Sequence, residues 1–116
     1  MHALELAESY FALSNQADLD TIESLFKTTS TYSSGQGLFF GPQDIMAMMR
    51  GFFSSHLELH WTIDAARQLT PYIAEIEFSF EGRDSQGKPI RRRGLERVVV
   101  HEGRIQHIEV RPLESN

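Results

Sequence analysis

Apolar and polar residues alternate with a period of two in two long segments of the C-terminal half. In residues 72–80 apolar side chains occupy every second position, and Ile73, Glu75, Glu77 and Ser79 lie between them, as expected of a half-buried strand. Residues 91–100 alternate in the same way: Val98 lies on one face, and Arg91, Arg93 and Arg97 lie on the other. A loop centred on Gln86 makes the two segments an antiparallel hairpin and keeps apolar opposite apolar. This register pairs Glu81 with Arg91, Ser79 with Arg93 and Glu75 with Arg97.

The same register predicts which residues form the apolar face of the hairpin. On the first strand these are Tyr72, Ala74, Ile76, Phe78 and Phe80. Glu96 of the second strand then lies beside Ile76 and Phe78, and it is the only carboxyl of the hairpin on that face. A carboxyl in apolar surroundings is either paired or has a raised pKa, so Glu96 is the most unusual residue of the sequence.

Three segments carry the helical period. Residues 3–14 place apolar side chains on one stripe, and Asp18 can cap a second short helix that ends near Phe26. A third helix begins at Gly41, because Pro42 suits the first helical turn. Its expected buried stripe is Ile45, Met48, Met49, Phe52 and Phe53. Each of the three helices is expected to bury its apolar stripe against another part of the fold.

The remaining segments predict further strands. Residues 28–34 are rich in hydroxyl and β-branched side chains, 38–40 form a brief apolar run, and 57–69 alternate, with Leu57 and Trp61 on the apolar face. Residues 113–116 are expected to be a frayed tail.

The last hairpin allows two registers. A three-residue loop, His101 to Gly103, sets Val98 opposite Gln106 and Glu96 opposite Ile108. Ile108 and Val110 then face the core, while His107 and Glu109 face outward. A two-residue Glu-Gly turn shifts the pairing by one and sends His107 and Glu109 inward. The first register is preferred because it buries two β-branched side chains and no further carboxylate.

Helices followed by long hairpin-joined strands predict an α+β domain spanning residues 1–116. In this fold a strongly curved antiparallel sheet wraps a helix layer, and the apolar interior of the cone can remain partly unfilled as a pocket.

Composition excludes several classes of function. The net charge of −5 argues against nucleic acid as a partner, and the arginines at 91–93 alternate between faces and find carboxylates opposite. No segment approaches the length of a membrane span, and the chain has no cysteine, so a cytoplasmic location is expected. The histidines fit no standard metal spacing, and the glycines at 35 and 37 carry no nucleotide fingerprint. Neither a metal nor a cofactor is expected.

Three segments carry a resemblance to a known family: YFALSNQADLDTIESLF, FFGPQDIMAMMRGFF and VVVHEGRIQHIEVRP. Their order over almost the whole chain resembles the nuclear transport factor 2-like (NTF2-like) superfamily. Within it the chain is similar to small bacterial members grouped with SnoaL-like polyketide cyclases and ketosteroid isomerases. The resemblance implies a cone-shaped fold and a homodimer. It does not fix the reaction, because the superfamily contains isomerases, cyclases and dehydratases alongside domains that only bind or dimerise.

The ketosteroid isomerase pattern can be carried over position by position. The tyrosine of its oxyanion hole falls on Tyr10, and the protonated acid falls on Glu96. The catalytic base is expected shortly after the second helix, where residues 27–34 contain no carboxylate and Ser34 takes the position. A hydroxyl without a partner base does not abstract a carbon-bound proton at a useful rate, so isomerisation of the steroid type is disfavoured. A phenol and a neutral acid could still bind a carbonyl oxygen.

These observations give a candidate site and two functions. Glu96 and Tyr10 are the catalytic candidates, although Glu96 could instead pair with Arg92 and Tyr10 could be a core aromatic. The expected ligand-binding residues are Tyr32, Phe40, Met49, Phe53, Trp61, Phe78, Val98 and Ile108. One function is a pocket for a small apolar or aromatic ligand bearing a carbonyl or hydroxyl, with or without isomerase, cyclase or dehydratase activity. The other is a non-catalytic binding or dimerisation module.

Overall fold

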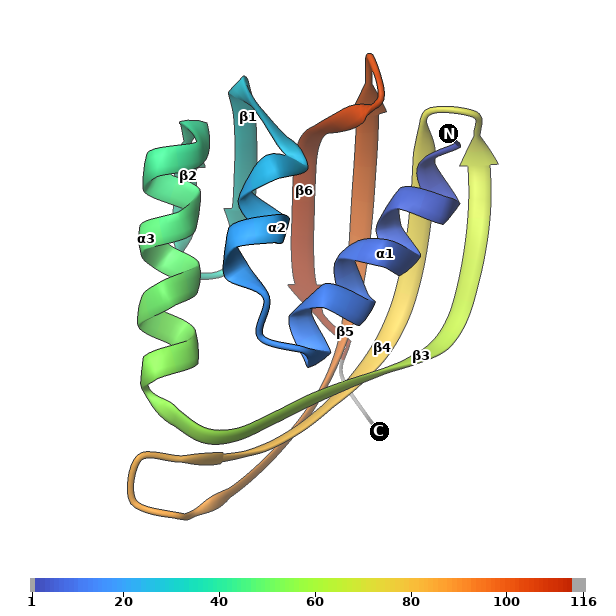
Figure 1. Ribbon diagram of the computed structural model, residues 1–116. Helices are drawn as coiled ribbons and strands as arrows, with labels where there is room; N and C mark the ends of the chain where they lie inside the picture. Colours follow the sequence, from blue (N-terminus) through green and yellow to red (C-terminus); the bar gives the residue numbers. More distant parts are fainter. Residues whose placement is uncertain (1, 114–116) are drawn as a thin grey trace.

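A computed structural model of the chain describes residues 2–113. It contains three helices and six strands (Figure 1). In chain order they are α1 (Ala3–Asn15), α2 (Leu19–Ser24), β1 (Phe26–Ser34), β2 (Gly37–Phe40), α3 (Gly41–Ser54), β3 (His56–Thr70), β4 (Ile73–Asp84), β5 (Pro89–His101) and β6 (Arg104–Pro112).

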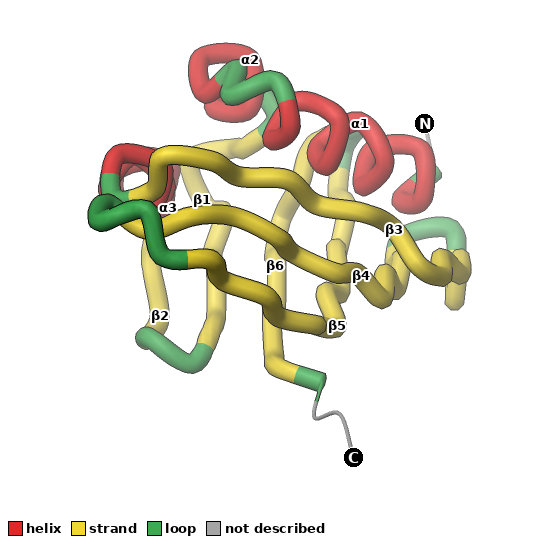
Figure 2. Tube along the Cα trace, turned by 90° about the horizontal axis from the view of Figure 1, so that it is seen from below, coloured by secondary structure: helices red, strands yellow, loops and turns green. Residues whose placement is uncertain are grey.

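The strands form one strongly curved sheet in the order β2-β1-β6-β5-β4-β3. The pairing of β1 with β6 is parallel and every other pairing is antiparallel, so the sheet is mixed. Figure 2 shows α1 and α2 on one side of the sheet, with α3 beside β1 at one end. The predicted α+β class and the sheet wrapped around about three helices are confirmed.

The helices begin where the sequence predicts. The Asp18 side chain caps α2, because its carboxylate accepts hydrogen bonds from the Thr21 backbone N at 3.2 Å and from Thr21 Oγ1 at 2.7 Å. Pro42 lies in the first turn of α3, as predicted. The buried stripe of α3 differs slightly from the prediction, since Met46 is fully buried and Met48 only partly.

The central hairpin has the predicted register. Glu81 pairs with Arg91, Ser79 with Arg93 and Glu75 with Arg97. Two apolar predictions near its edge strand are wrong. Tyr72 is 64% exposed because it lies in the turn before β4, and Leu57 is 65% exposed because an irregularity between His56 and Glu58 takes it out of the ladder.

The last hairpin follows the two-residue-turn register only next to its turn, and the preferred pairs Val98 with Gln106 and Glu96 with Ile108 are wrong. The turn has two residues, Glu102 and Gly103, both with positive φ (55° and 75°), so the three-residue loop is wrong. An extra residue, Gln106, then shifts the register between the pairs at Val100 and Val99. As a result Val98 pairs with Ile108 and Glu96 with Val110. This bulge keeps Ile108 buried and Glu109 exposed, as expected, despite the shorter turn.

The residue after β6 is hydrogen-bonded to the neighbouring strand β5. Leu113 is tied to β5, because its backbone N donates to the Arg93 carbonyl at 3.0 Å, so the predicted fraying is wrong for this residue. The rest of the predicted tail, 114–116, lies outside the described residues. No helix within residues 2–113 is long and apolar enough to cross a membrane.

Candidate functional site

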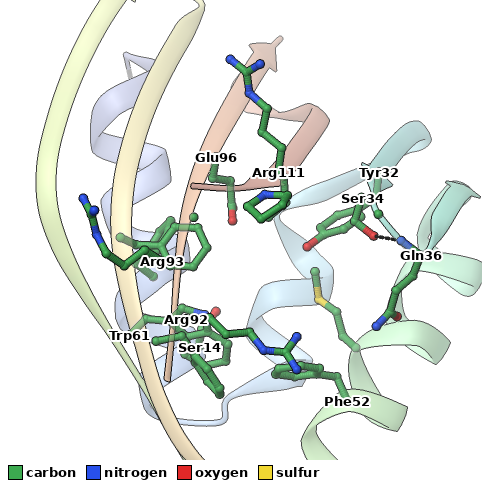
Figure 3. A pocket seen from close by; sticks show the side chains of 18 of the residues that line it. Ser14, Tyr32, Ser34, Gln36, Phe52, Trp61, Arg92, Arg93, Glu96 and Arg111 are labelled. Carbon is green, nitrogen blue, oxygen red and sulfur yellow. Dashed lines mark hydrogen bonds between the residues drawn. The ribbon is translucent and has the colours of Figure 1, made fainter. Parts of the chain in front are cut away.

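A cavity of about 590 Å³ opens between the helices and the concave face of the sheet (Figure 3). This volume is in the range of small-molecule sites. Its walls are mostly apolar and come from α1, α3 and five strands. The apolar side chains are Phe11, Met48, Met49, Phe52, Phe53, Trp61, Phe78, Phe80, Val110, Pro112 and Leu113. The cone is therefore not filled by its own side chains.

Aromatic rings of α3 and the sheet form one side of the cavity. The ring centroids of Trp61 and Phe80 lie 5.0 Å apart, and those of Phe53 and Trp61 lie 5.7 Å apart. The end of α1 fixes the backbone at Trp61, since Asn15 Nδ2 donates to the Trp61 carbonyl at 2.9 Å and Trp61 N donates to Asn15 Oδ1 at 2.8 Å. This aromatic wall offers flat surfaces on which a ring can stack.

Glu96 provides the carboxyl of the cavity. It is 5% exposed, its strand neighbours Ile76 and Val110 are apolar, and Oε2 has no hydrogen-bond partner among residues 2–113. Burial raises the pKa of Glu96 to about 8, because the charged form loses its hydration. The ion pair with Arg92 considered from the sequence is not formed. At neutral pH the side chain is a protonated acid with an O–H to donate.

Two phenols lie near this acid. Tyr10 comes from α1 and Tyr32 from β1, and both line the cavity together with Glu96. Burial is the main reason that the pKa of each phenol is raised, and the nearby Glu96 carboxyl adds to the effect in both. Three elements far apart in sequence thus bring two neutral phenols and one neutral acid together, and all three are potential donors to a ligand oxygen.

The position expected for a carboxylate base holds a serine. Ser34 lies on the cavity wall, and its Oγ accepts a hydrogen bond from the Gln36 backbone N at 3.2 Å. Glu96 is the only carboxylate among the cavity-lining residues that the structure describes. The site therefore has an acid and hydroxyl groups but no separate base.

Arginines surround the mouth of the cavity. Figure 3 shows the Arg92 side chain extending across the mouth towards Phe52, whereas those of Arg93 and Arg111 extend away from the cavity. Between Arg92 and Glu96 lies Gly94, and a Cβ there would stand 2.4 Å from Cζ of Phe78. Only glycine lets the Phe78 ring lie directly against the strand.

The structure brings together most of the residues expected from the sequence. On the cavity wall lie Tyr10, Tyr32, Met49, Phe53, Trp61, Phe78 and Glu96. Phe40 does not belong to the wall, because it is 63% exposed at the end of the edge strand β2. Val98 and Ile108 are fully buried in the packed core and not in the cavity.

Sequence reasoning did not select Ser14, Gln36 or Arg92 as site residues. Gln36 had no signal, since it lies in a turn whose position depends on the whole fold, whereas Ser14 lies one helical turn after Tyr10 on the same stripe. The sequence did contain a signal for Arg92, because strand alternation puts it on the same face as Glu96. No group of three His, Cys, Asp or Glu side chains within residues 2–113 could hold a metal ion.

Comparison with known proteins agrees with this geometry. Residues 7–108 match the model of the SnoaL-like domain. Among solved structures, a ketosteroid isomerase-like protein from Catenulispora acidiphila, in complex with trimethylamine, has 16% identity and a TM-score of 0.82 over 91% of this chain and 83% of that one. An NTF2-like protein of unknown function from Exiguobacterium has 16% identity and a TM-score of 0.84 over 95% and 99%. TerC, co-crystallised with polyporic acid, has 10% identity and a TM-score of 0.81 over 93% and 88%. No curated protein matches the chain.

The curved sheet with helices on its concave face is thus an NTF2-like fold. Since the family model covers most of the sequence, the chain belongs to the SnoaL-like domain family. At these identities the solved structures establish the fold alone.

Proposed function

We propose that this protein binds a small apolar or aromatic molecule that carries a carbonyl or hydroxyl oxygen. The observation that carries the proposal is the buried Oε2 of Glu96, which faces the cavity without a partner among residues 2–113. A buried donor left unsatisfied costs about 1–3 kcal/mol, and a ligand oxygen at this position would remove that cost. Tyr10 and Tyr32 lie close enough to orient the same end of the ligand.

The side chains that line the cavity indicate the chemical class of the ligand. Aromatic rings and methionines cover most of the surface, so an aromatic body gains from burial and stacking. The two similar structures whose names include a bound compound, trimethylamine in one case and polyporic acid in the other, support use of such a cavity for small molecules. We place this protein in the cytoplasm and expect a homodimer with no nucleic-acid or membrane partner.

The protonation state of Glu96 gives a direct test. The probe is 2-acetonaphthone, whose ketone only accepts hydrogen bonds, and its affinity is measured by calorimetry between pH 7 and pH 9. The affinity of the wild type should fall about 10-fold at pH 9, because a group with a pKa of about 8 is then mostly ionised and has lost its O–H. The two phenols near Glu96 do not change charge over this range, since burial keeps Tyr10 and Tyr32 neutral.

Two variants complete the test. Glu96→Gln keeps an N–H donor and should bind the ketone with little change between pH 7 and pH 9. Glu96→Met has a similar volume without a donor and should bind about 5- to 10-fold more weakly at pH 7. Equal affinity of the wild type at both pH values, with the fold intact by circular dichroism, would contradict the role of Glu96. Failure of the wild type to bind the ketone at pH 7 would contradict the proposed ligand class.

A second candidate function is catalysis by Glu96 as a general acid. Its pKa of about 8 is close to the working pH of a cell, which suits an acid that donates a proton in an isomerase, cyclase or dehydratase step. Without a second carboxylate in the cavity we expect binding without carbon deprotonation. Exchange of the methyl protons of bound 2-acetonaphthone in D₂O, followed by NMR, should be no faster than in buffer. Faster exchange that disappears in Glu96→Gln would instead establish catalysis that requires Glu96.

A further inference from the structure

Arg92 is the charged residue that belongs to the cavity and has no evident structural role. It lies on β5 opposite Phe80, two residues from Gly94 and four from Glu96, so all three share the inner face of the strand. Its guanidinium points across the mouth of the cavity towards Phe52 (Figure 3). The aromatic rings beneath the guanidinium stabilise it only weakly, whereas a ligand anion would supply a full opposite charge.

Two other arginines of β5 form ion pairs. Arg91 pairs with Glu81 at 3.0 Å, and Arg97 pairs with Glu75 at 3.0 Å, both on the outer face of the sheet. Arg92 makes no ion pair or side-chain hydrogen bond with residues 2–113. Among the described residues that line the cavity the only carboxyl is Glu96, which is neutral at pH 7 and lies deeper in the cavity. Within residues 2–113 the cavity therefore has no ionised carboxylate to pair with Arg92; Arg93 and Arg111 are also without an ion pair, but their side chains extend away from the cavity.

The spacing along β5 sets the size of the ligand. Four residues of antiparallel strand span about 13 Å between Arg92 and Glu96, and each side chain shortens the gap when it leans towards the other. Between them the Phe78 ring lies against Gly94 and provides a flat surface. One or two fused rings fit between a hydrogen bond at one end and a guanidinium at the other. Guanidinium recognises a carboxylate with two parallel hydrogen bonds.

We propose that the cavity selects aromatic carboxylates, with the carboxylate at Arg92 and a hydroxyl or carbonyl oxygen at Glu96. This inference rests on the proposed function and adds the charge of the ligand and its direction in the site. The acid group remains near the opening, where water still reaches it, and the polar oxygen enters first.

The test compares two probes that differ only at the carboxyl group, which is charged in one and a neutral amide in the other. These are 6-hydroxy-2-naphthoic acid, ionised at pH 6.5, and its neutral carboxamide, both titrated by calorimetry. The wild type should bind the acid about 10-fold tighter than the amide, which is the effect of one partly exposed charge-assisted pair. In Arg92→Gln the two probes should differ by less than about 2-fold, and Arg92→Lys should keep part of the preference because it keeps the charge but not the bidentate geometry.

Arg93→Gln is the matched control, since Arg93 is the next residue of the same strand and extends away from the cavity. It removes the same net charge and should leave the preference unchanged. Equal binding of acid and amide by the wild type would overturn the inference and leave the proposed function standing. Equal loss in Arg92→Gln and Arg93→Gln would also overturn it, because a general surface potential would then explain the preference. No binding of either probe would contradict both proposals.

Discussion

Replacing Glu96 with glutamine should change how the stability of the protein depends on pH. In the folded protein burial raises the pKa of Glu96 to about 8, whereas the ordinary value is 4.5. Between these two pH values the folded state holds a proton that the unfolded state has released. The free energy of unfolding of the wild type therefore falls as the pH rises through this window, and the contribution is constant below pH 4.5 and above pH 8.

The magnitude follows from the difference between the two pKa values. Each pH unit within the window costs about 1.4 kcal/mol, so raising the pH from 4.5 to 7 removes about 3 kcal/mol, and the whole window about 5 kcal/mol. Glutamine has a similar shape and no charge, so the variant lacks this loss. Relative to the wild type, Glu96→Gln should gain about 3 kcal/mol by pH 7. For a chain of this length that corresponds to a difference in Tm of roughly 10 °C.

The assay is urea unfolding at pH 5, 6, 7 and 8, followed by the fluorescence of Trp61 and by circular dichroism. The lowered pKa values of Glu75, held by Arg67 and Arg97, and of Glu102, held by Lys27, act in the opposite direction, because their stabilisation is lost as the pH falls. These contributions are present in both proteins and cancel in the difference.

Glu8→Gln is the control, since Glu8 is exposed on α1 and undergoes the same chemical change. It should track the wild type at every pH. If Glu96→Gln also tracks the wild type from pH 5 to pH 8, then Glu96 is not held neutral by burial. The reasoning about its role as a donor would then be wrong.

Three further predictions concern the walls of the cavity and the assembly. Gly94→Ala should destabilise the protein by about 1–3 kcal/mol in urea unfolding, because its Cβ would stand 2.4 Å from the Phe78 ring. Gly51→Ala, in α3 with no atom near the new Cβ, should instead stabilise it by about 0.5–1 kcal/mol; the reverse order would contradict the packing. Asn15→Ala removes both hydrogen bonds to the Trp61 backbone and should cost about 1–3 kcal/mol and shift the tryptophan emission to the red, whereas unchanged emission would show that the wall is held by other contacts. Sedimentation at micromolar concentration should give a dimer, and a monomer would exclude the homodimer.

Much of the fold follows from local patterns in the sequence. The alternation of residues 72–80 and 91–100 was sufficient to fix the register of the central hairpin, because a shift by one residue would turn every side chain to the other face. The cap at Asp18 and the proline at 42 located the starts of two helices for reasons that involve only neighbouring residues. The same alternation put Glu96 on the inner face of the sheet.

Irregularities of the strands were not visible in the pattern. The bulge at Gln106 lets a two-residue turn coexist with a buried Ile108, and no residue type at that position requires it. Leu57 has the apolar character of an inward residue, yet the irregularity at the start of β3 leaves it exposed. A bulge depends on how two strands meet along their whole length, so local propensity does not reveal it.

By itself the sequence determined the fold class, the hairpin register and the presence of one carboxyl on the apolar face. The tertiary structure alone decided which apolar residues line the cavity and which fill the core. Val98 and Ile108 share the inner face with Glu96, but they lie where the packing is closed, and Phe40 lies outside it. The tertiary structure also brought Tyr10, Tyr32 and Arg92 to the same cavity as Glu96. The physical reason is that periodicity fixes the face of an element, whereas a cavity depends on how far the helices cover the curved sheet.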